Sequence, residues 1–277
     1  MSKQQTANDL LASTASWTAS VRAQENARAD ALFRDPWAEA LAGPEGRDWI
    51  AQRPPDKTLA IVLRTRYFDD FLQRVSREHA LPQVVLMAAG YDTRAYRLGW
   101  PGGTHLYEMD QAAVLRRKAQ ILEAANAQPN CVRQTVELNL GKSWQEELTA
   151  AGFSPHTPSL WLLEGFLFYL PGEQVQEILE QVSVLAAPGS WLGFDIINSI
   201  MLNHPYTKAW IDMQAASGAP WIGTLDDPVA FLARLGWKAA LSQAGQPDAN
   251  FGRWTLPVLP TEMPNVPHNW FVTAQKL

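Results

Sequence analysis

From residue 82 onward, hydrophobic residues fall into short blocks rich in Val, Ile, Leu and Trp, and most blocks are separated by longer stretches with helical periodicity. Short apolar blocks predict strands, and strands that alternate with helices predict a mostly parallel, doubly wound α/β sheet. The expected strands are Val84–Ala88, Thr104–Met109, Cys131–Val136, Leu160–Leu163, Trp191–Ile197, Trp237–Leu241 and Trp270–Ala274. Because right-handed crossovers bring the carboxyl ends of parallel strands to one edge, we expect a ligand to bind there.

The last expected strand differs from the others in how the chain reaches it. It follows an irregular segment that contains Pro260, Pro264 and Pro267 and is too short for a crossover helix. We therefore expect this strand to run antiparallel, at the edge of the sheet. Seven strands with an antiparallel last strand differ from the six-stranded sheet that binds dinucleotides.

Residues 1–80 have a helical pattern instead. Ala7–Asp30 is rich in Ala with apolar residues at helical intervals, and Asp35-Pro36 opens a second expected helix. Gly43-Pro44-Glu45-Gly46 interrupts that second helix. Lys57–His79 is predicted as a long amphipathic helix that packs one face on the sheet.

Composition limits the class of protein. With 277 residues, of which 47% are hydrophobic and 18% charged, the chain can form one sizeable core. The net charge is −5 and the Lys and Arg residues are scattered among acids, so we expect no nucleic-acid partner. The single cysteine, Cys131, lies in an apolar run, which fits a buried residue in a reducing compartment.

Several other classes are disfavoured by what the sequence lacks. The first twenty residues have no apolar region typical of a secretory signal, and no apolar run reaches the roughly eighteen residues that a membrane span needs. We therefore expect a cytoplasmic protein that does not bind a membrane. No group of His and Cys residues has the spacing of metal ligands, and no Gly-x-Ser-x-Gly elbow of a serine hydrolase occurs.

The most informative stretch runs from Val84 to Leu98. It is typical of a strand followed by a tight turn, Ala88-Ala89-Gly90, and Asp110 ends the next apolar block. This layout can hold the adenosine part of a cofactor. The turn lacks the Gly-x-Gly-x-x-Gly pattern of dinucleotide sites, and Asp92 would repel a phosphate. The turn therefore favours a nucleoside without a diphosphate.

Five motifs in a fixed order make the pattern specific. They are Phe33-Arg34-Asp35-Pro36, Arg64-Thr65-Arg66-Tyr67-Phe68-Asp69-Asp70, the turn Ala89–Leu98, Tyr107-Glu108-Met109-Asp110 and Leu163-Glu164-Gly165-Phe166-Leu167-Phe168-Tyr169-Leu170. Together they resemble the leucine carboxyl methyltransferase family of S-adenosyl-L-methionine-dependent methyltransferases, which includes many bacterial members that act on small molecules. The resemblance extends from about Arg22 to the closing strand.

The resemblance implies one methyltransferase domain, residues 1–277, with a seven-stranded Rossmann-like sheet. Residues 1–80 would form an N-terminal helical extension, and residues 81–197 would form the cofactor-binding core. Residues 198–250 would be a helical lid over the substrate, and residues 251–277 would carry the closing strand.

The family motifs also imply roles for residues at matching positions. Arg64 and, in a looser alignment, Arg22 would pair with the methionine carboxylate of S-adenosyl-L-methionine. The turn at Ala89 and Gly90 would admit the methionine part of this cofactor. Asp110 would accept hydrogen bonds from the ribose hydroxyls.

Two further motifs complete the expected cofactor site. Asn139 and Leu140 would contact adenine, and the side-chain carbonyl of Asn139 can accept a hydrogen bond as the family's aspartate does. Glu164 would lie beneath the sulfonium and amino end. Ala88 replaces a family glycine, and Gly141 replaces the arginine with which the family prototype grips its substrate's carboxylate. Methylation of a protein's terminal carboxylate is therefore not supported.

Simpler interpretations remain open for several residues. Arg64 also fits a solvated helix arginine, and Asp110 also fits the cap of the helix that starts near Gln111. Tyr169 and His204 are the candidates for a general base, if the acceptor needs one. His204 also fits an exposed residue at a helix boundary.

The expected lid indicates the kind of acceptor. It carries apolar and aromatic residues that suit a small apolar or planar molecule, although core packing is the other interpretation: Met201, Tyr206, Trp210, Met213, Trp221 and Phe231. We expect O-methylation, with C- or N-methylation in the same fold as alternatives. A nucleotide-dependent oxidoreductase and a non-catalytic cofactor-binding protein are alternatives of other classes. Leu10, Leu11 and Trp17 leave a homo-oligomer open.

Overall fold

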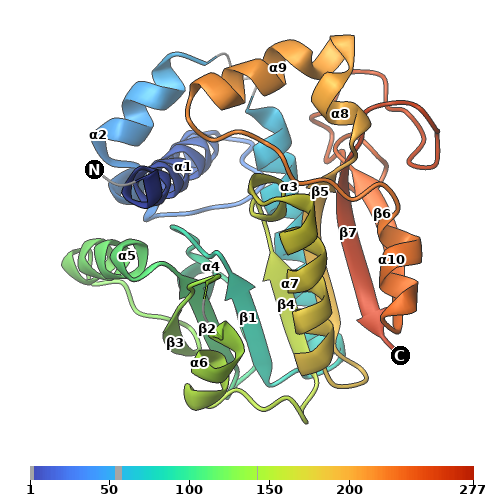
Figure 1. The fold of residues 1–277 in the computed structure, drawn as a ribbon. Coiled ribbons are helices and arrows are strands. Elements are labelled where there is room, and N and C mark those ends of the chain that lie inside the picture. The colour runs from blue at the N-terminus through green and yellow to red at the C-terminus, as the bar shows by residue number, and fades with distance from the viewer. Residues whose placement is uncertain (1–2, 54–57, 142) are drawn as a thin grey trace.

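The computed structural model describes residues 3–53, 58–141 and 143–277, with side chains from residue 14 onward. Within these ranges the strands form one seven-stranded sheet in the order β3-β2-β1-β4-β5-β7-β6 (Figure 1). The strands are β1 Gln83–Met87, β2 His105–Asp110, β3 Val132–Glu137, β4 Ser159–Leu163, β5 Trp191–Ile197, β6 Trp237–Gln243 and β7 Asn269–Lys276. The predicted α/β class and its seven strands are confirmed.

β7 breaks the parallel order of the sheet. β1 pairs parallel with β2 and β4, whereas β7 pairs antiparallel with both β5 and β6. The predicted direction of the last strand is therefore confirmed, but its predicted place at the edge is wrong. β7 carries the consecutive buried residues Trp270, Phe271 and Val272, which need cover on both sides, while β6 is partly exposed and forms the edge.

Helices cover both faces of the sheet. The amphipathic helix α3 (Leu59–Glu78) packs on one face through Phe68, Phe71 and Leu72. α7 (Gly172–Leu185) belongs to the core cluster on the other face. The central strands β1 and β4 are buried along their whole length, as expected for parallel strands covered on both sides.

A third group of helices lies over the carboxyl ends of the parallel strands (Figure 1). It contains α1 (Lys3–Asn26), α2 (Ala38–Ala51) and α9 (Pro205–Ala216). α1 and α2 approach closely at Gly46, where a Cβ atom would lie 2.5 Å from the Ser16 carbonyl oxygen. The interruption expected at Gly43-Pro44 is a kink inside α2, with a φ of 59° at Gly43, and not the end of the helix.

The remaining helical segments are short, apart from α5. They are α4 Arg94–Arg97, α5 Ala112–Ala124, α6 Trp144–Ala150, the 3-10 turn η2 Leu167–Tyr169, α8 Ile200–Asn203 and α10 Pro228–Arg234. α10 packs on β6 and buries Phe231 and Leu232 in the main core. Only the first half of the predicted lid, α8, α9 and the following loop, therefore lies outside the α/β body.

The turn after β1 contains a strained residue. Ala88 has a φ of 53°, in the left-handed region that favours glycine. The next residue, Ala89, is not among those with positive φ, and its N–H donates to the Met109 carbonyl oxygen at 2.9 Å. Alanine at position 88 therefore stores backbone strain beside the ligand-binding edge of the sheet.

We expect Ala88→Gly to raise the free energy of unfolding by roughly 0.5 to 1 kcal/mol, because relief of the left-handed strain exceeds the added entropy of the unfolded chain. Ala89→Gly is the matched control and should lower that free energy. Urea unfolding of both variants measures the difference. Equal losses in the two variants would contradict a strained Ala88.

Candidate active site

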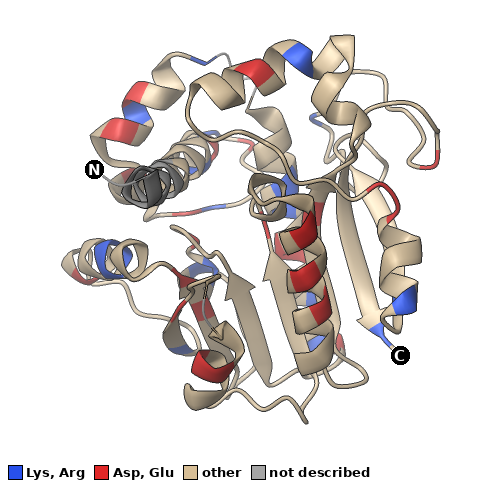
Figure 2. Cartoon of the chain, in the orientation of Figure 1, with Lys and Arg blue, Asp and Glu red and all other residues tan. Residues whose placement is uncertain are grey.

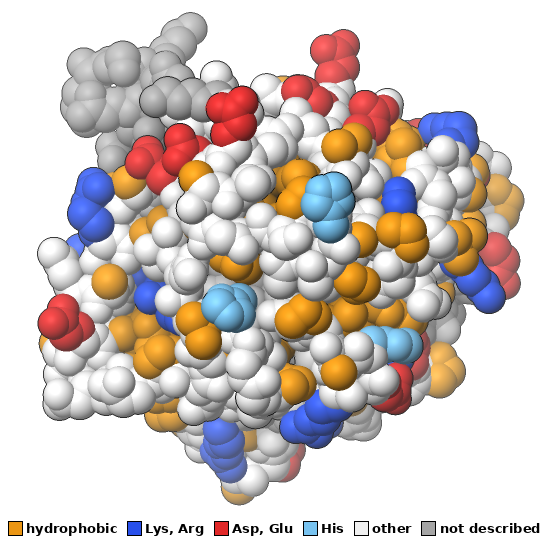
Figure 3. Space-filling view, turned by 90° about the horizontal axis from the view of Figure 1, so that it is seen from below, with side chains coloured by type: hydrophobic (Ala, Val, Ile, Leu, Met, Phe, Trp, Pro, Cys, Tyr) orange, Lys and Arg blue, Asp and Glu red, His pale blue; other side chains and the backbone are white. Residues whose placement is uncertain are grey.

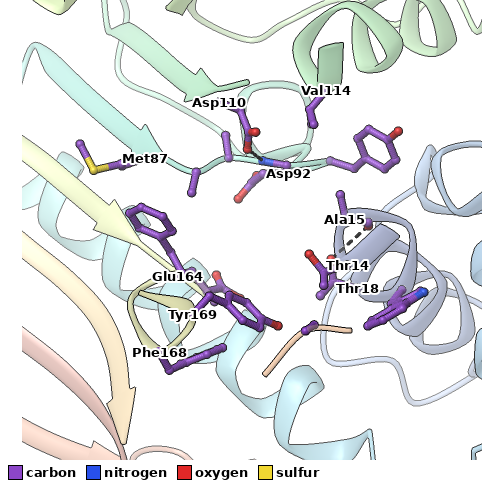
Figure 4. Close-up of a pocket in the computed structure, with 18 of the residues that line it drawn as sticks. Thr14, Ala15, Thr18, Met87, Asp92, Asp110, Val114, Glu164, Phe168 and Tyr169 are labelled. Atoms are coloured by element: carbon purple, nitrogen blue, oxygen red, sulfur yellow. Dashed lines mark hydrogen bonds between the residues drawn. The ribbon is translucent and has the colours of Figure 1, made fainter. Parts of the chain in front are cut away.

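A cavity of about 1030 Å³ opens at the carboxyl ends of β1, β2 and β4, beneath α1. Its lining includes nine of the ten residues that the sequence singles out: Arg22, Arg64, Ala89, Gly90, Asp110, Asn139, Leu140, Glu164 and Tyr169. Figure 4 shows three sides of it, with Asp92 and Asp110 on one side, Glu164 and Tyr169 on the second, and Thr14 and Thr18 of α1 on the third. The structure thus brings the predicted cofactor residues together.

The glycine turn and the end of β2 are tied by hydrogen bonds. The Gly90 N–H donates to Oδ2 of Asp110 at 2.6 Å, and the Gln111 N–H donates to Oδ1 at 2.7 Å. Gly90 has a φ of 46°, and a Cβ atom there would lie 3.3 Å from the Cβ of Ala15 on α1. Any side chain at position 90 would therefore crowd the helix that roofs the cavity.

Asp110 does not cap α5. The residue at the N-terminal cap of α5 is Gln111, and that cap has no side-chain hydrogen bond. Each carboxylate oxygen of Asp110 accepts one hydrogen bond from a backbone N–H and keeps a second lone pair, so the group can still accept from two hydroxyls. Burial raises the pKa of Asp110, although the N–H groups of Gly90 and Gln111 oppose this.

Arg64 is a buried arginine with two carboxylate partners and not a solvated one. Its Nε donates to Oε1 of Glu164 at 2.9 Å, and its Nη1 donates to Oδ2 of Asp195 at 2.8 Å. The Arg64 side chain is 10% exposed. The neighbouring Arg66 faces outward and pairs with Asp70 on the surface.

Arg94 is a central residue to which the sequence assigned no role, although it lies in a recognised motif. Its guanidinium contacts three carboxylates, with Nε 2.6 Å from Asp69, Nη1 2.5 Å from Asp92 and Nη2 2.7 Å from Glu164. Burial opposes ionisation of Asp92, but Arg94 together with other nearby basic side chains outweighs it and lowers the pKa of Asp92 to about 2. Asp69 also binds Arg97 through both of its oxygens.

Carboxylates outnumber guanidinium groups in this buried cluster. Among the described residues, Asp69, Asp92, Glu164 and Asp195 face Arg64, Arg94 and Arg97 in a connected set of ion pairs. Figure 2 shows both acidic and basic residues where the parallel strands end. An excess of negative charge favours a cationic ligand, and a sulfonium compound with an amino acid part carries a net positive charge.

The other predicted cofactor residues lie around the same cavity. Arg22 donates through Nε to Asp35 at 2.8 Å and through Nη2 to the Tyr91 carbonyl oxygen at 2.6 Å, so it fixes the turn after β1. Asn139 and Leu140 are exposed residues of the lining that follow β3. These positions suit contact with the outer part of a bound nucleoside.

The two candidates for a general base lie in different environments. Tyr169 lines the cavity beside Glu164 (Figure 4), and burial raises the pKa of its hydroxyl. His204 is not among the described residues that line the cavity. It caps α9, where its Nδ1 accepts from the Tyr206 N–H at 3.2 Å. The structure therefore brings Tyr169 to the site and leaves His204 at a helix boundary.

The seven-stranded sheet with an antiparallel β7, together with a carboxylate after β2 that is bound to a glycine turn after β1, defines the class of S-adenosyl-L-methionine-dependent methyltransferases. Residues 15–183 match the family model of the leucine carboxyl methyltransferases. The chain belongs to that family.

Relatives support the same assignment over most of the chain. A protein of Frankia alni named "Putative S-adenosyl-L-methionine-dependent methyltransferase" is 39% identical over 253 residues, which cover 87% of each chain. A protein of Streptomyces avermitilis with the same description is 38% identical over 258 residues, again with 87% of each chain covered. The protein is therefore an S-adenosyl-L-methionine-dependent methyltransferase, and the alternative of a nucleotide-dependent oxidoreductase is set aside.

Solved structures confirm the fold. The crystal structure of a DUF574 family protein from Streptomyces avermitilis has a TM-score of 0.56 at 13% identity and covers 94% of this chain and 97% of that one. A structure from Thermobifida fusca has a TM-score of 0.52 at 14% identity and covers 94% of each chain.

Membrane-spanning helices and metal-binding clusters are both absent from the described residues. None of the helices described here is long and apolar enough to cross a membrane. No group of three or more His, Cys, Asp or Glu residues in the described part of the chain has the arrangement of a metal site.

The raised pKa of Asp110 makes cofactor binding sensitive to pH. We expect the affinity for S-adenosylhomocysteine to fall as the pH drops through this pKa, because a protonated carboxyl accepts hydrogen bonds from ribose hydroxyls less well. The fall should begin at a higher pH than for an ordinary aspartate. Calorimetry across the acidic range measures the effect.

Asp110→Asn is the matched variant for this prediction. It should weaken binding at neutral pH by about tenfold and remove the step in the pH dependence. Because a carboxyl with a raised pKa takes up its proton in the folded state first, this protonation does not destabilise the protein. An unchanged pH step in the variant would show that another group causes it.

Proposed function

We propose that this methyltransferase methylates an oxygen atom of a small acceptor with apolar or aromatic character. The supporting observation is the set of aromatic side chains that line the cavity, here called the aromatic wall, which differs from the charged cluster in its chemistry. It is formed by Trp17, Trp49, Phe168, Tyr169, Trp210 and Trp221. Pockets for small molecules typically combine such a wall with few polar groups.

The aromatic side chains of this wall pack on one another. Phe168 lies 4.8 Å from Tyr169 and 4.3 Å from Trp221, measured between ring centroids, and Trp221 lies 6.0 Å from Trp210. On the other side, Trp17 and Trp49 are stacked at 5.3 Å. Rings held by such contacts offer flat, preformed surfaces, which suit a planar acceptor.

The cavity supports alignment of the acceptor more strongly than deprotonation. The donor, when bound, supplies an electrophilic methyl group. Because burial raises the pKa of Tyr169, its hydroxyl keeps its proton at neutral pH and acts as a hydrogen-bond donor to the acceptor. An acceptor oxygen that ionises by itself, in a carboxylate or an acidic phenol, needs only to be oriented and shielded from water.

The same site argues against macromolecular acceptors. Gly141 carries no side chain that could grip a terminal carboxylate, and its N–H donates to Asn139 at 3.0 Å. Its neighbour Lys142 lies outside the described residues. On the face seen in Figure 3, Lys and Arg side chains are scattered among apolar and neutral ones, which supports the absence of a nucleic-acid partner.

The experiment is an acceptor panel incubated with S-adenosyl-L-methionine and analysed by intact mass and product NMR. Planar phenols and aryl carboxylic acids should gain a methyl group on oxygen. Methyl groups found only on nitrogen or carbon would contradict O-methylation, and the absence of turnover with every planar acceptor would contradict the proposed acceptor class.

We expect Tyr169→Phe to lower kcat/KM for the acceptor about tenfold, through loss of one hydrogen bond to the bound oxygen. The affinity for S-adenosylhomocysteine should stay within about twofold of the wild type, because the change leaves the ring and the charged cluster in place. Steady-state kinetics and calorimetry check the two parts. A variant that lost cofactor affinity as well would place Tyr169 in the donor site instead.

We further propose that the protein forms a homo-oligomer through α1. The side chains of Leu10 and Leu11 lie outside the described residues, while Trp17 faces the cavity and stacks on Trp49. Light scattering of the protein with and without its first twenty residues would test whether α1 contacts a second copy.

A further inference from the structure

Asp195 is a fully buried carboxylate behind the cavity wall. It lies on β5, has 0% of its surface exposed and is not among the described residues that line the cavity. Its two oxygens bind two different groups: Oδ2 accepts from Arg64 Nη1 at 2.8 Å, and Oδ1 accepts from the Gly165 N–H at 2.6 Å. Both partners do line the cavity.

The two carboxylates that hold Arg64 fix the plane of its guanidinium. Glu164 binds Nε and Asp195 binds Nη1, so the fork is anchored at two of its three nitrogens. Of the five guanidinium N–H groups, these bonds leave the two on Nη2 and one on Nη1 for a ligand. A guanidinium held in this way presents a fixed edge to a carboxylate.

Gly165 lies against the same guanidinium. Its φ of 67° lies in the left-handed region, and a Cβ atom at this position would lie 3.1 Å from Arg64 Nη2. Because Asp195 also holds the N–H of Gly165, it sets the peptide that follows Glu164. Asp195 therefore helps to position both the Arg64 guanidinium and the Glu164 carboxylate.

Charge balance does not explain this residue. Glu164 already neutralises Arg64, and burying a second carboxylate costs free energy unless it is well bound. We propose that Asp195 is a positioning residue, which aims the Arg64 guanidinium at the carboxylate of the donor's methionine part. This inference depends on the pairing of Arg64 with that carboxylate, which the family resemblance implies.

Two ligands distinguish a role of Asp195 in orienting Arg64 from a role in stabilising the fold. S-adenosylhomocysteine carries the amino acid part, and 5′-deoxy-5′-methylthioadenosine lacks it. Asp195→Asn keeps the shape and can still accept from Gly165, but it turns an amide donor toward the N–H groups of Arg64. We expect this variant to lower the affinity for S-adenosylhomocysteine by roughly tenfold to a hundredfold and the affinity for methylthioadenosine by less than about threefold.

Gly165→Ala tests the geometry without changing a charge. Its methyl group would lie 3.1 Å from Arg64 Nη2 and displace the guanidinium. Like Asp195→Asn, this variant should therefore lower the ratio of the affinity for S-adenosylhomocysteine to that for methylthioadenosine. This second variant keeps the proposal testable if Asp195→Asn does not fold.

Glu108→Gln is the matched control for loss of a buried carboxylate. Glu108 is also 0% exposed, and it pairs with Lys118 at 2.8 Å and Arg133 at 2.6 Å, neither of which is among the described cavity residues. The control should lower the free energy of unfolding while leaving the ratio of the two affinities unchanged.

Calorimetry of both ligands on each variant decides among the outcomes. Arg64→Ala alone should lower the ratio of the affinity for S-adenosylhomocysteine to that for methylthioadenosine. Adding Asp195→Asn to Arg64→Ala should not lower this ratio further. If Arg64→Ala leaves the ratio unchanged, the placement of Arg64 is wrong. If Arg64→Ala lowers the ratio but Asp195→Asn does not, or if Asp195→Asn weakens both ligands equally, the positioning role of Asp195 is overturned. None of these measurements involves the acceptor.

Discussion

The interaction on which the cavity depends is the contact of one guanidinium, that of Arg94, with three carboxylates. Asp69 comes from α3, Asp92 from the turn after β1 and Glu164 from the end of β4. Without the cation, three buried like charges would repel one another in a medium of low dielectric constant. Removal of one partner of a buried ion pair typically destabilises a protein by about 3–5 kcal/mol. The same ion pairs therefore hold three distant segments of the chain together and set the electrostatics of the cavity.

The lining of the cavity combines this charged cluster with aromatic side chains. Near it, fixed charges of both signs and a slight excess of carboxylates suit a zwitterionic donor with an added positive charge. The aromatic wall, which includes Tyr169 beside Glu164, consists of stacked and tilted rings. Such a lining suits the proposed transfer of a methyl group from a charged donor to a weakly polar acceptor, because each partner is then solvated by groups that match it.

The sequence predicted much of this and missed particular parts for physical reasons. Apolar blocks such as Val84–Ala88 marked the strands because central parallel strands are buried on both faces, and Gly90 and Asp110 were found because they follow such blocks. Arg64 and Asp195 are separated by 131 positions, and only the packing of α3 against the sheet at β4 and β5 brings them together. No local pattern encodes that pairing. The order of β6 and β7 likewise depends on tertiary packing.

The place of β7 has a consequence for the order in which the protein folds. β6 joins the sheet only through β7, and β5 has β7 as its partner on that side. Until β7 has been synthesised, the edge of β5 stays open and β6 has no strand to pair with. An open edge is a template for wrong pairing. The partly folded chain is therefore most vulnerable to aggregation before β7 pairs, and loss of β7 would remove an interior strand.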